Sequence, residues 1–226
     1  MYVLVASLLL LACTQAVEIQ IGNDDGGDIW VGIQGDPNNA HLNYGGVVIG
    51  SKQTVTLYAP PNWHGRIWAR TWCSGLNNHC LTGDCGSKLY CASAGPESPV
   101  TLVEFQMQPS GDHRYAISTK RGFNILAKVE SLSGNCDSTS CQTRINNDCP
   151  DELKYDTSQG VLGCKSACVA FNNDEYCCTG DNSGDNCNSN KYTDWFSNEC
   201  PDTITMPNAD LNRQCNTDGF KITFGG

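Results

Sequence analysis

Cysteine is the residue type whose number and spacing in this sequence could do chemistry. Cys80, Cys85 and Cys91 lie within twelve residues around a Thr-Gly-Asp turn, and Cys73 lies just upstream. A loop this short buries little apolar surface, so covalent bonds must hold it in place. The chain has 15 cysteines, and the 14 that follow Cys13 form an even set. We therefore predict seven disulfides, formed in an oxidising compartment.

A zinc cluster is the alternative interpretation of so many cysteines. It is not favoured, because His41, His64, His79 and His113 show no zinc-ligand spacing. The acidic run at 181–185 resembles a calcium loop but lacks the EF-hand spacing and its terminal Glu. Sequence motifs of serine hydrolases, phosphate-binding loops and zinc proteases are also absent. We therefore expect no metal and no cofactor.

The first sixteen residues indicate export. Residues 1–16 are nearly all apolar and carry no charged side chain, and Thr14-Gln15-Ala16 fits a small-residue cleavage site. Their apolar core of about ten residues is too short to span a bilayer. We predict a signal peptide over 1–16, a mature chain that begins near Val17, and a secreted, extracellular protein with no membrane span.

Composition restricts the partners of the chain. The formal net charge is −10, so nucleic acids and anionic membranes, which are negatively charged themselves, are poor partners. Hydrophobic residues make up only 39% of the 226 residues, which indicates a modest core. Disulfides, at about 2–4 kcal/mol each, must therefore supply much of the stability. We expect a monomer.

The pattern of apolar residues favours a β-sandwich. Apolar and polar residues alternate in short segments that are separated by clusters of Gly, Asn and Pro. Many short strands with frequent turns are typical of two packed antiparallel sheets. The expected strands are 17–22, 28–34, 53–59, 65–71, 100–106, 113–119, 123–130 and 218–224.

Residues 131–201 differ from the rest, because they hold nine cysteines and are rich in Asn, Asp, Ser and Gly. One helix is expected, over 163–176. Cys177 and Cys178 should bond in opposite directions, since a ring between neighbours is strained. We predict a mainly β protein with three parts. These are an antiparallel sandwich (about 17–72, 92–130 and 202–226), a small stapled loop (73–91) and a disulfide-rich subdomain of loops and short helices (131–201).

Several motifs, taken in order, resemble the thaumatin-like family over the whole mature chain. They are Gly-Arg-Ile-Trp-Ala-Arg-Thr-Trp-Cys at 65–73, Cys-x-Thr-Gly-Asp-Cys at 80–85, Leu-Val-Glu-Phe at 102–105, Gly-Phe-Asn at 122–124, Glu-Tyr-Cys-Cys at 175–178 and Cys-Pro-Asp at 200–202. The resemblance implies a thaumatin-like sandwich and seven disulfides. Their implied partners are Cys73–Cys80, Cys85–Cys91, Cys136–Cys215, Cys141–Cys200, Cys149–Cys164, Cys168–Cys177 and Cys178–Cys187.

An eighth disulfide of the larger family members is missing. It joins the first strand to the last, and Asn23-Asp24 and Phe224-Gly225 stand where its cysteines would be. Both partners are missing together, so no thiol is left unpaired. The chain thus resembles a divergent member of the larger type.

The resemblance also implies a cleft that binds or hydrolyses β-1,3-glucan, usually lined by one Arg, one Glu and three Asp. Here the Arg corresponds to Arg66 and the Glu to Glu104. Two of the three Asp positions hold Ala116 and Arg121, and the third falls beside Asp210. Glu104 and Asp210 are thus the candidate catalytic residues, and Arg66, Glu104 and Asp210 the candidate substrate-binding residues.

These substitutions argue against efficient hydrolysis. Glycoside hydrolysis needs two carboxyl groups, ~5–5.5 Å apart for retention or ~6.5–9.5 Å apart for inversion. A cation at Arg121 would also weaken Glu104 as a general acid. Two structural alternatives stay open, an ion pair between Glu104 and Arg66 and a merely solvated Arg66.

The sequence therefore favours a defence-type protein that binds β-1,3-glucan or a related cell-wall polysaccharide without efficient hydrolysis. A weak endo-β-1,3-glucanase and an antifungal protein that perturbs membranes are the alternatives. The second alternative is disfavoured by the net charge of −10, because anionic membranes repel an acidic protein.

Overall fold

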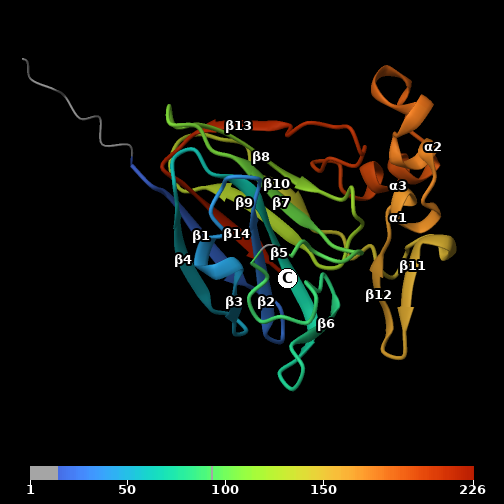
Figure 1. The fold of residues 1–226 in the computed structure, drawn as a ribbon, viewed down its shortest axis with the longest axis horizontal. Coiled ribbons are helices and arrows are strands. Elements are labelled where there is room, and N and C mark those ends of the chain that lie inside the picture. Colours follow the sequence, from blue (N-terminus) through green and yellow to red (C-terminus); the bar gives the residue numbers. More distant parts are fainter. Residues whose placement is uncertain (1–14, 93) are drawn as a thin grey trace, which may run out of the picture.

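The computed structural model describes residues 15–92 and 94–226, so residues 1–14 of the predicted signal peptide lie outside the described chain. Two β-sheets pack face to face, and a disulfide-rich subdomain lies beside them (Figure 1). The first sheet has five strands in the order β10-β9-β14-β1-β4. Their bounds are β1 Val17–Asn23, β4 Thr54–Ala59, β9 Ala127–Ser131, β10 Thr139–Cys141 and β14 Gly219–Phe224.

The second sheet follows the order β13-β8-β7-β5-β2-β3, and a further strand, β6, pairs with β5. All strand pairs in both sheets are antiparallel except β1 with β14. The bounds are β2 Ile29–Gly35, β3 Gly46–Ile49, β5 His64–Ser74, β6 His79–Thr82, β7 Leu102–Gln106, β8 Asp112–Ser118 and β13 Arg213–Asn216.

The core lies between the inner faces of the two sheets. Alternate residues of each strand point inward, and those of β1 and β14 are buried completely, including Ile19, Ile21, Phe220, Ile222 and Phe224. β14 lies between β1 and β9. The prediction that the last strand pairs inside the sandwich is therefore confirmed.

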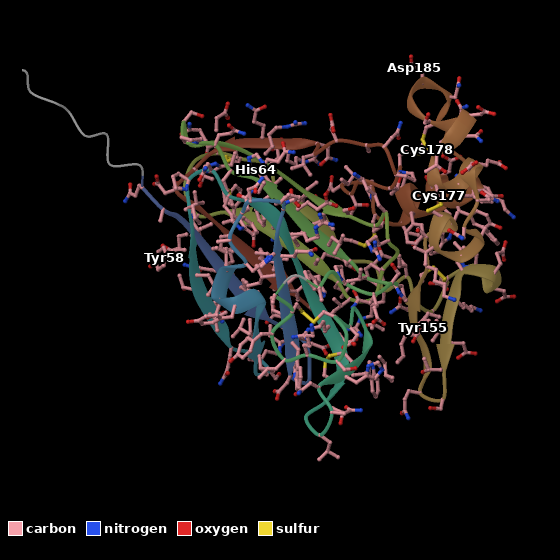
Figure 2. The ribbon with its side chains drawn as sticks, in the orientation of Figure 1. Tyr58, His64, Tyr155, Cys177, Cys178 and Asp185 are labelled. Carbon is pink, nitrogen blue, oxygen red and sulfur yellow. A yellow bond between two sulfur atoms is a disulfide. The ribbon has the colours of Figure 1, made fainter. Side chains whose placement is uncertain are left out.

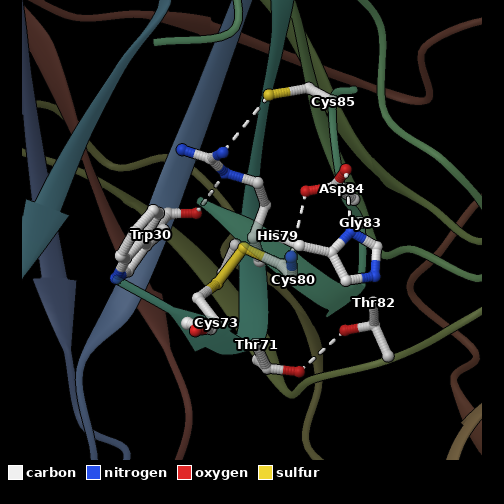
Figure 3. The surroundings of a disulfide bond; sticks show 12 residues. Trp30, Thr71, Cys73, His79, Cys80, Thr82, Gly83, Asp84 and Cys85 are labelled. Atoms are coloured by element: carbon white, nitrogen blue, oxygen red, sulfur yellow. Dashed lines mark hydrogen bonds and ion pairs between the residues drawn. A yellow bond between two sulfur atoms is a disulfide. The ribbon is translucent and has the colours of Figure 1, made fainter. Parts of the chain in front are cut away.

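The stapled loop covers the outer face of β5. Trp68 and Arg70 point outward from this strand, yet both are fully buried. The Trp68 indole donates to the Gly83 carbonyl at 2.8 Å, and Arg70 donates to the carbonyls of Lys88 (2.6 Å) and Leu89 (2.7 Å). Part of the loop is itself a strand, β6, which pairs with β5 around the Cys73–Cys80 disulfide (Figure 3). The sequence, which shows no strand period there, did not predict it.

The subdomain contains the hairpin β11 Lys154–Thr157 with β12 Gly160–Cys164, and three short α-helices. The helices are α1 Ala167–Phe171, α2 Asp174–Cys177 and α3 Lys191–Glu199. Short 3-10 turns occur at η1 Leu42–Gly45, η2 Asp151–Leu153, η3 Gly180–Asn182 and η4 Gly184–Asn186.

The single helix expected over 163–176 is wrong. Cys164 instead ends β12, where its backbone bonds to that of Phe123. Ser166 then caps α1, and Asn172 adopts a left-handed conformation that ends it. Asn173 caps α2 directly afterwards, so Asn side chains divide the apolar pattern into two helices.

Two predicted boundaries also shift. The strand expected over 123–130 begins only at Ala127, because 123–126 turns toward the subdomain through the Phe123–Cys164 bridge. Residues 139–141, expected in the subdomain, form edge strand β10 beside β9. Thr139 and Cys141 are both buried there, which draws this segment into the sandwich.

All seven disulfides have the partners that the family resemblance implies, and they are Cys73–Cys80, Cys85–Cys91, Cys136–Cys215, Cys141–Cys200, Cys149–Cys164, Cys168–Cys177 and Cys178–Cys187. Cys177 and Cys178 bond in opposite directions, as predicted (Figure 2). The subdomain has its own small core of aromatic side chains and cysteines, which includes Tyr192 and Phe196 of α3.

Candidate functional site

Strand pairing brings Arg66 and Glu104 together. Arg66 on β5 lies directly opposite Glu104 on β7, and Glu104 lies opposite Ala116 on β8. Residues that are directly opposite in neighbouring strands point to the same face of a sheet. The next residues along two of these strands, Ile67 and Val103, are buried in the sandwich core, so the three opposed residues point outward. We call Arg66, Glu104, Ala116 and the nearby Arg121 the polar face.

The stapled loop explains why this face is open. The loop buries Trp68 and Arg70 farther along β5, but the Arg66 side chain remains 36% exposed. Glu104 is likewise only half-buried. The outer surface of β5 is thus covered by the loop at Trp68 and Arg70 and open to solvent at Arg66.

Asp36, rather than Glu104, is the ion-pair partner of Arg66. Arg66 Nη2 lies 2.9 Å from Asp36 Oδ1. Asp36 directly follows β2, in which Gln34 pairs with Arg66, so the sheet itself places the carboxylate there. The Glu104 side chain makes no hydrogen bond or ion pair with any residue that the structure describes. The alternative of a structural Arg66–Glu104 ion pair is therefore wrong.

Arg121 adds a second positive charge to the polar face. The Arg121 guanidinium donates to the Pro96 carbonyl at 3.1 Å. Loss of solvent around the group lowers the pKa of Arg121, and the positive charge of Arg66 lowers it further. The charge of Arg66 therefore acts on Arg121, and the two guanidinium groups repel each other across the polar face.

Asp210 lies in an exposed loop before β13. Its neighbours are anchored, because Lys120 donates to the Ala209 carbonyl and Arg114 donates to the Leu211 carbonyl at 2.8 Å. The Asp210 side chain itself makes no hydrogen bond or ion pair within the described chain, so no such bond joins it to Glu104 or Arg66. The strand pairing thus brings Arg66 to Glu104 but does not bring Asp210 to either.

Asp36 is the residue of this site that sequence reasoning missed. The sequence indicates Asp36 only weakly. The residue lies just after a strand, and the end of that strand pairs with the strand that carries Arg66. Among the described residues, no group of three or more His, Cys, Asp or Glu could hold a metal ion. No helix in the described part of the chain is long and apolar enough to cross a membrane.

Comparison with known proteins identifies the family. A family model described as the Thaumatin family matches residues 23–226. The chain belongs to the thaumatin family. A thaumatin-family relative, the pathogenesis-related thaumatin-like protein 3.5 of Cryptomeria japonica, is 36% identical over 205 residues, which are 87% of this chain and 84% of the relative. A thaumatin-like protein of Arabidopsis thaliana is 34% identical over 231 residues, 98% of this chain and 95% of the relative.

Among solved structures, that of a thaumatin-like xylanase inhibitor superposes with a TM-score of 0.48 at 19% sequence identity, over 91% of this chain and 97% of the inhibitor.

Proposed function

We propose that this thaumatin-family chain is a secreted, defence-type protein that binds β-1,3-glucan or a related cell-wall polysaccharide without efficient hydrolysis. Relatives whose names describe them as pathogenesis-related support the defence role. Seven disulfides suit an extracellular protein. The observation that carries the proposal is the outward pair of Arg66 and Glu104, beside which Asp36 is bonded to Arg66 while the Glu104 carboxylate has no partner among the described residues.

The polar face has the groups that bind sugar hydroxyls. The Glu104 carboxylate is a hydrogen-bond acceptor that no described residue uses. Arg66 is oriented by Asp36 and keeps further N–H donors for a ligand. A hydroxyl can both donate to Glu104 and accept from Arg66, and each charge-assisted bond is stronger than a neutral one.

The same face lacks a second free acid for hydrolysis, because the Asp36 carboxylate beside it is bonded to Arg66 at 2.9 Å. Ala116 lies opposite Glu104 in β8, where the family usually has an Asp. Arg121 contributes a positive charge, which the positive charge of Arg66 repels. One carboxylate can hold a sugar, but general acid catalysis with a nucleophile or base needs two.

Binding and hydrolysis are measured together on the purified chain with an insoluble β-1,3-glucan. We expect binding with negligible release of sugar, and Glu104→Gln should weaken binding at least about tenfold, because a charge-assisted hydrogen bond contributes about 1.5–3 kcal/mol. The matched control is Glu175→Gln, since Glu175 is an exposed carboxylate with no bond to a described residue.

Robust hydrolysis that Glu104→Gln abolishes would contradict the proposal and would favour the glucanase alternative. The double variant Ala116→Asp with Arg121→Asp restores the family carboxylates. We expect it to raise the negligible hydrolysis while the control variant leaves it unchanged.

A further inference from the structure

A pocket of about 810 Å³ lies at the far end of β5 from Arg66. Its walls come from the turn between β1 and β2, the end of β5 and the subdomain segment 144–147, and its floor is 123–126. None of the polar-face residues lines it. The volume is within the range of about 300–1,000 Å³ that is usual for small-molecule sites.

Trp72 is the most unusual residue of this pocket. Its side chain is 56% exposed, and its backbone has a left-handed φ of +58°. Such a conformation is strained for a bulky residue and persists only where the surroundings enforce it. Both neighbours are fixed, since the Thr71 hydroxyl bonds to the Thr82 hydroxyl at 2.7 Å and Cys73 is bonded to Cys80. The chain therefore holds an apolar ring out in the pocket rather than in the core.

Trp30 adds a second aromatic ring to the lining. It lies on β2 beside the end of β5, near Thr71 and Cys73 (Figure 3). The buried Arg70 guanidinium lies 5.6 Å from the centre of the Trp30 ring, and Arg70 Nε donates to the Trp30 carbonyl at 3.0 Å. These two contacts with Arg70 hold Trp30 in place. A ring that is ordered before a ligand arrives loses little side-chain entropy on binding.

Polar groups with unused bonding capacity surround the two rings. The side chains of Asp25, Asp28 and Asn147 line the pocket, and none of them bonds to a residue that the structure describes. Asn146 donates to the carbonyls of Asn124 (3.1 Å) and Leu162 (3.3 Å), which ties the subdomain wall to the floor. Its buried Oδ1 has no partner in the described chain.

The charges of the lining define the ligand. A purely apolar ligand would remove Asp25 and Asp28 from water without replacing their hydrogen bonds, which is costly. An anion would be repelled by the same carboxylates, and the Arg144 guanidinium on the subdomain wall already donates to the Gly226 carbonyl. A neutral molecule with apolar faces and hydroxyl groups can place its faces on the rings and donate to the carboxylates, because a hydroxyl both donates and accepts.

We propose that this pocket is a second saccharide site, which takes a short run of neutral pyranose units with their C–H faces on Trp72 and Trp30. The choice of a saccharide rests on the proposed function, but the site shares no residue with the polar face. Two sites on one chain would allow it to hold two segments of a polysaccharide, which raises its avidity.

Titration calorimetry of the mature chain with a soluble β-1,3-linked glucose hexamer tests the proposal. We expect two sites in the unaltered protein and one in Trp72→Ala, and at least tenfold weaker binding at this pocket in Asp28→Ala. Trp72→Phe should keep both sites, because a ring remains, but should reduce the tryptophan fluorescence change on binding to the part contributed by Trp30. Tyr44→Ala is the control, since Tyr44 is 81% exposed and lies outside the lining.

The variants separate this inference from the proposed function. The double variant Arg66→Ala with Glu104→Gln should remove only the polar-face site. If that variant abolishes binding while Trp72→Ala and Asp28→Ala bind like Tyr44→Ala, the second site is refuted and the proposed function stands. If only the Trp72 and Asp28 variants lose binding, the polar-face proposal fails and the pocket stands. Absence of hexamer binding in the unaltered chain refutes the second site outright.

Discussion

Asn23 and Phe224 lie opposite each other in the parallel strands β1 and β14, where the larger thaumatin-like proteins have their additional disulfide. Asn23 is 1% exposed, and its amide donates to the carbonyls of Gly27 (2.8 Å) and Ile49 (2.9 Å). The next backbone amide, of Asp24, donates to the Phe224 carbonyl at 2.7 Å. The Asn23 side chain therefore ties the end of β1 to the following turn and to β3, and the Asp24 backbone bonds to the last strand where a covalent bond is missing.

Asn23→Ala should destabilise the fold by about 1–3 kcal/mol, because it leaves buried carbonyl groups without donors. The midpoint of urea unfolding measures the loss. Asn77→Ala, which changes an exposed Asn, is the control and should leave the midpoint nearly unchanged. Equal midpoints for the two variants would show that the buried bonds of Asn23 do not stabilise the fold.

Asp36→Asn should weaken glucan binding more than it weakens the fold. The Arg66 and Asp36 side chains are 36% and 38% exposed, so solvent screens their ion pair and its loss costs about 0–1 kcal/mol of stability. Arg66 would nevertheless lose its fixed orientation toward a ligand. The control is Asp24→Asn, which breaks the exposed Lys52–Asp24 pair. Unchanged glucan binding in Asp36→Asn, measured beside its melting temperature, would exclude this orienting role.

Acid should loosen the stapled loop through Asp84. Asp84 Oδ1 accepts from the Cys80 amide (3.0 Å) and Oδ2 from the Ser87 amide (2.7 Å), while His79 Nδ1 lies 3.4 Å from Oδ2. Burial raises the pKa of Asp84, but the backbone hydrogen bonds and the His79 charge outweigh it, and the pKa is lowered. The stabilisation is therefore complete above the unfolded pKa of about 3.9 and is lost as pH falls through the lower folded value.

Hydrogen exchange at the Cys80 and Ser87 amides, measured from pH 7 downward, tests this expectation. Protection of the two amides should hold to about pH 4 and fall below it. In Asp84→Asn the protection should be low throughout and should lose this acid step. An acid step of the same size in Asp84→Asn would assign the loosening to another group.

His113 should make the sandwich less stable below neutral pH. The ring is 2% exposed, and its Nδ1 accepts from the Gln108 amide at 2.9 Å. Burial lowers the pKa of His113 from 6.5, although a bond to the Thr217 backbone and the charge of Asp112 oppose the shift. The unfolded chain binds the proton more readily, so this stability is present above about pH 6.5 and is lost as pH falls through the folded pKa.

The melting temperature between pH 5 and 8 measures this contribution. We expect it to fall with acid in the unaltered chain and to become flatter in His113→Gln, which keeps an acceptor but does not titrate. His64→Gln is the control, because His64 is only half-buried, and the pH dependence should survive in it. A flat profile in the unaltered chain would exclude His113 as the titrating group.

The strands could be predicted from sequence because their signal is local. Apolar alternation reports which face of β1 or β14 is buried, and the cysteine spacing, through the family resemblance, gives the disulfide partners. A residue that is buried by a segment distant in the sequence shows no such local pattern. Arg70 is a charged residue on the outer face of a strand, and only the folded stapled loop explains its full burial.

Helix α3 shows a signal that was present but overlooked. Asn190 caps it, the side chains of Asn190 and Thr193 form a capping box, and Tyr192 and Phe196 lie four residues apart on its buried face. Its polar surroundings hid that pattern.

At the polar face, the positions of Arg66 and Glu104 follow from strand order. The contact of Arg66 with Asp36 requires in addition the register of three strands.

The position of β14 has a consequence for how the protein is made. β14 is the last strand in the chain, yet it occupies the middle of the five-stranded sheet. Until β14 has been synthesised and has paired, β1 and β9 each have an exposed edge that can pair with a wrong strand. The five-stranded sheet is therefore completed by its central strand, and its two halves stay open to mispairing longer than the strands of the other sheet.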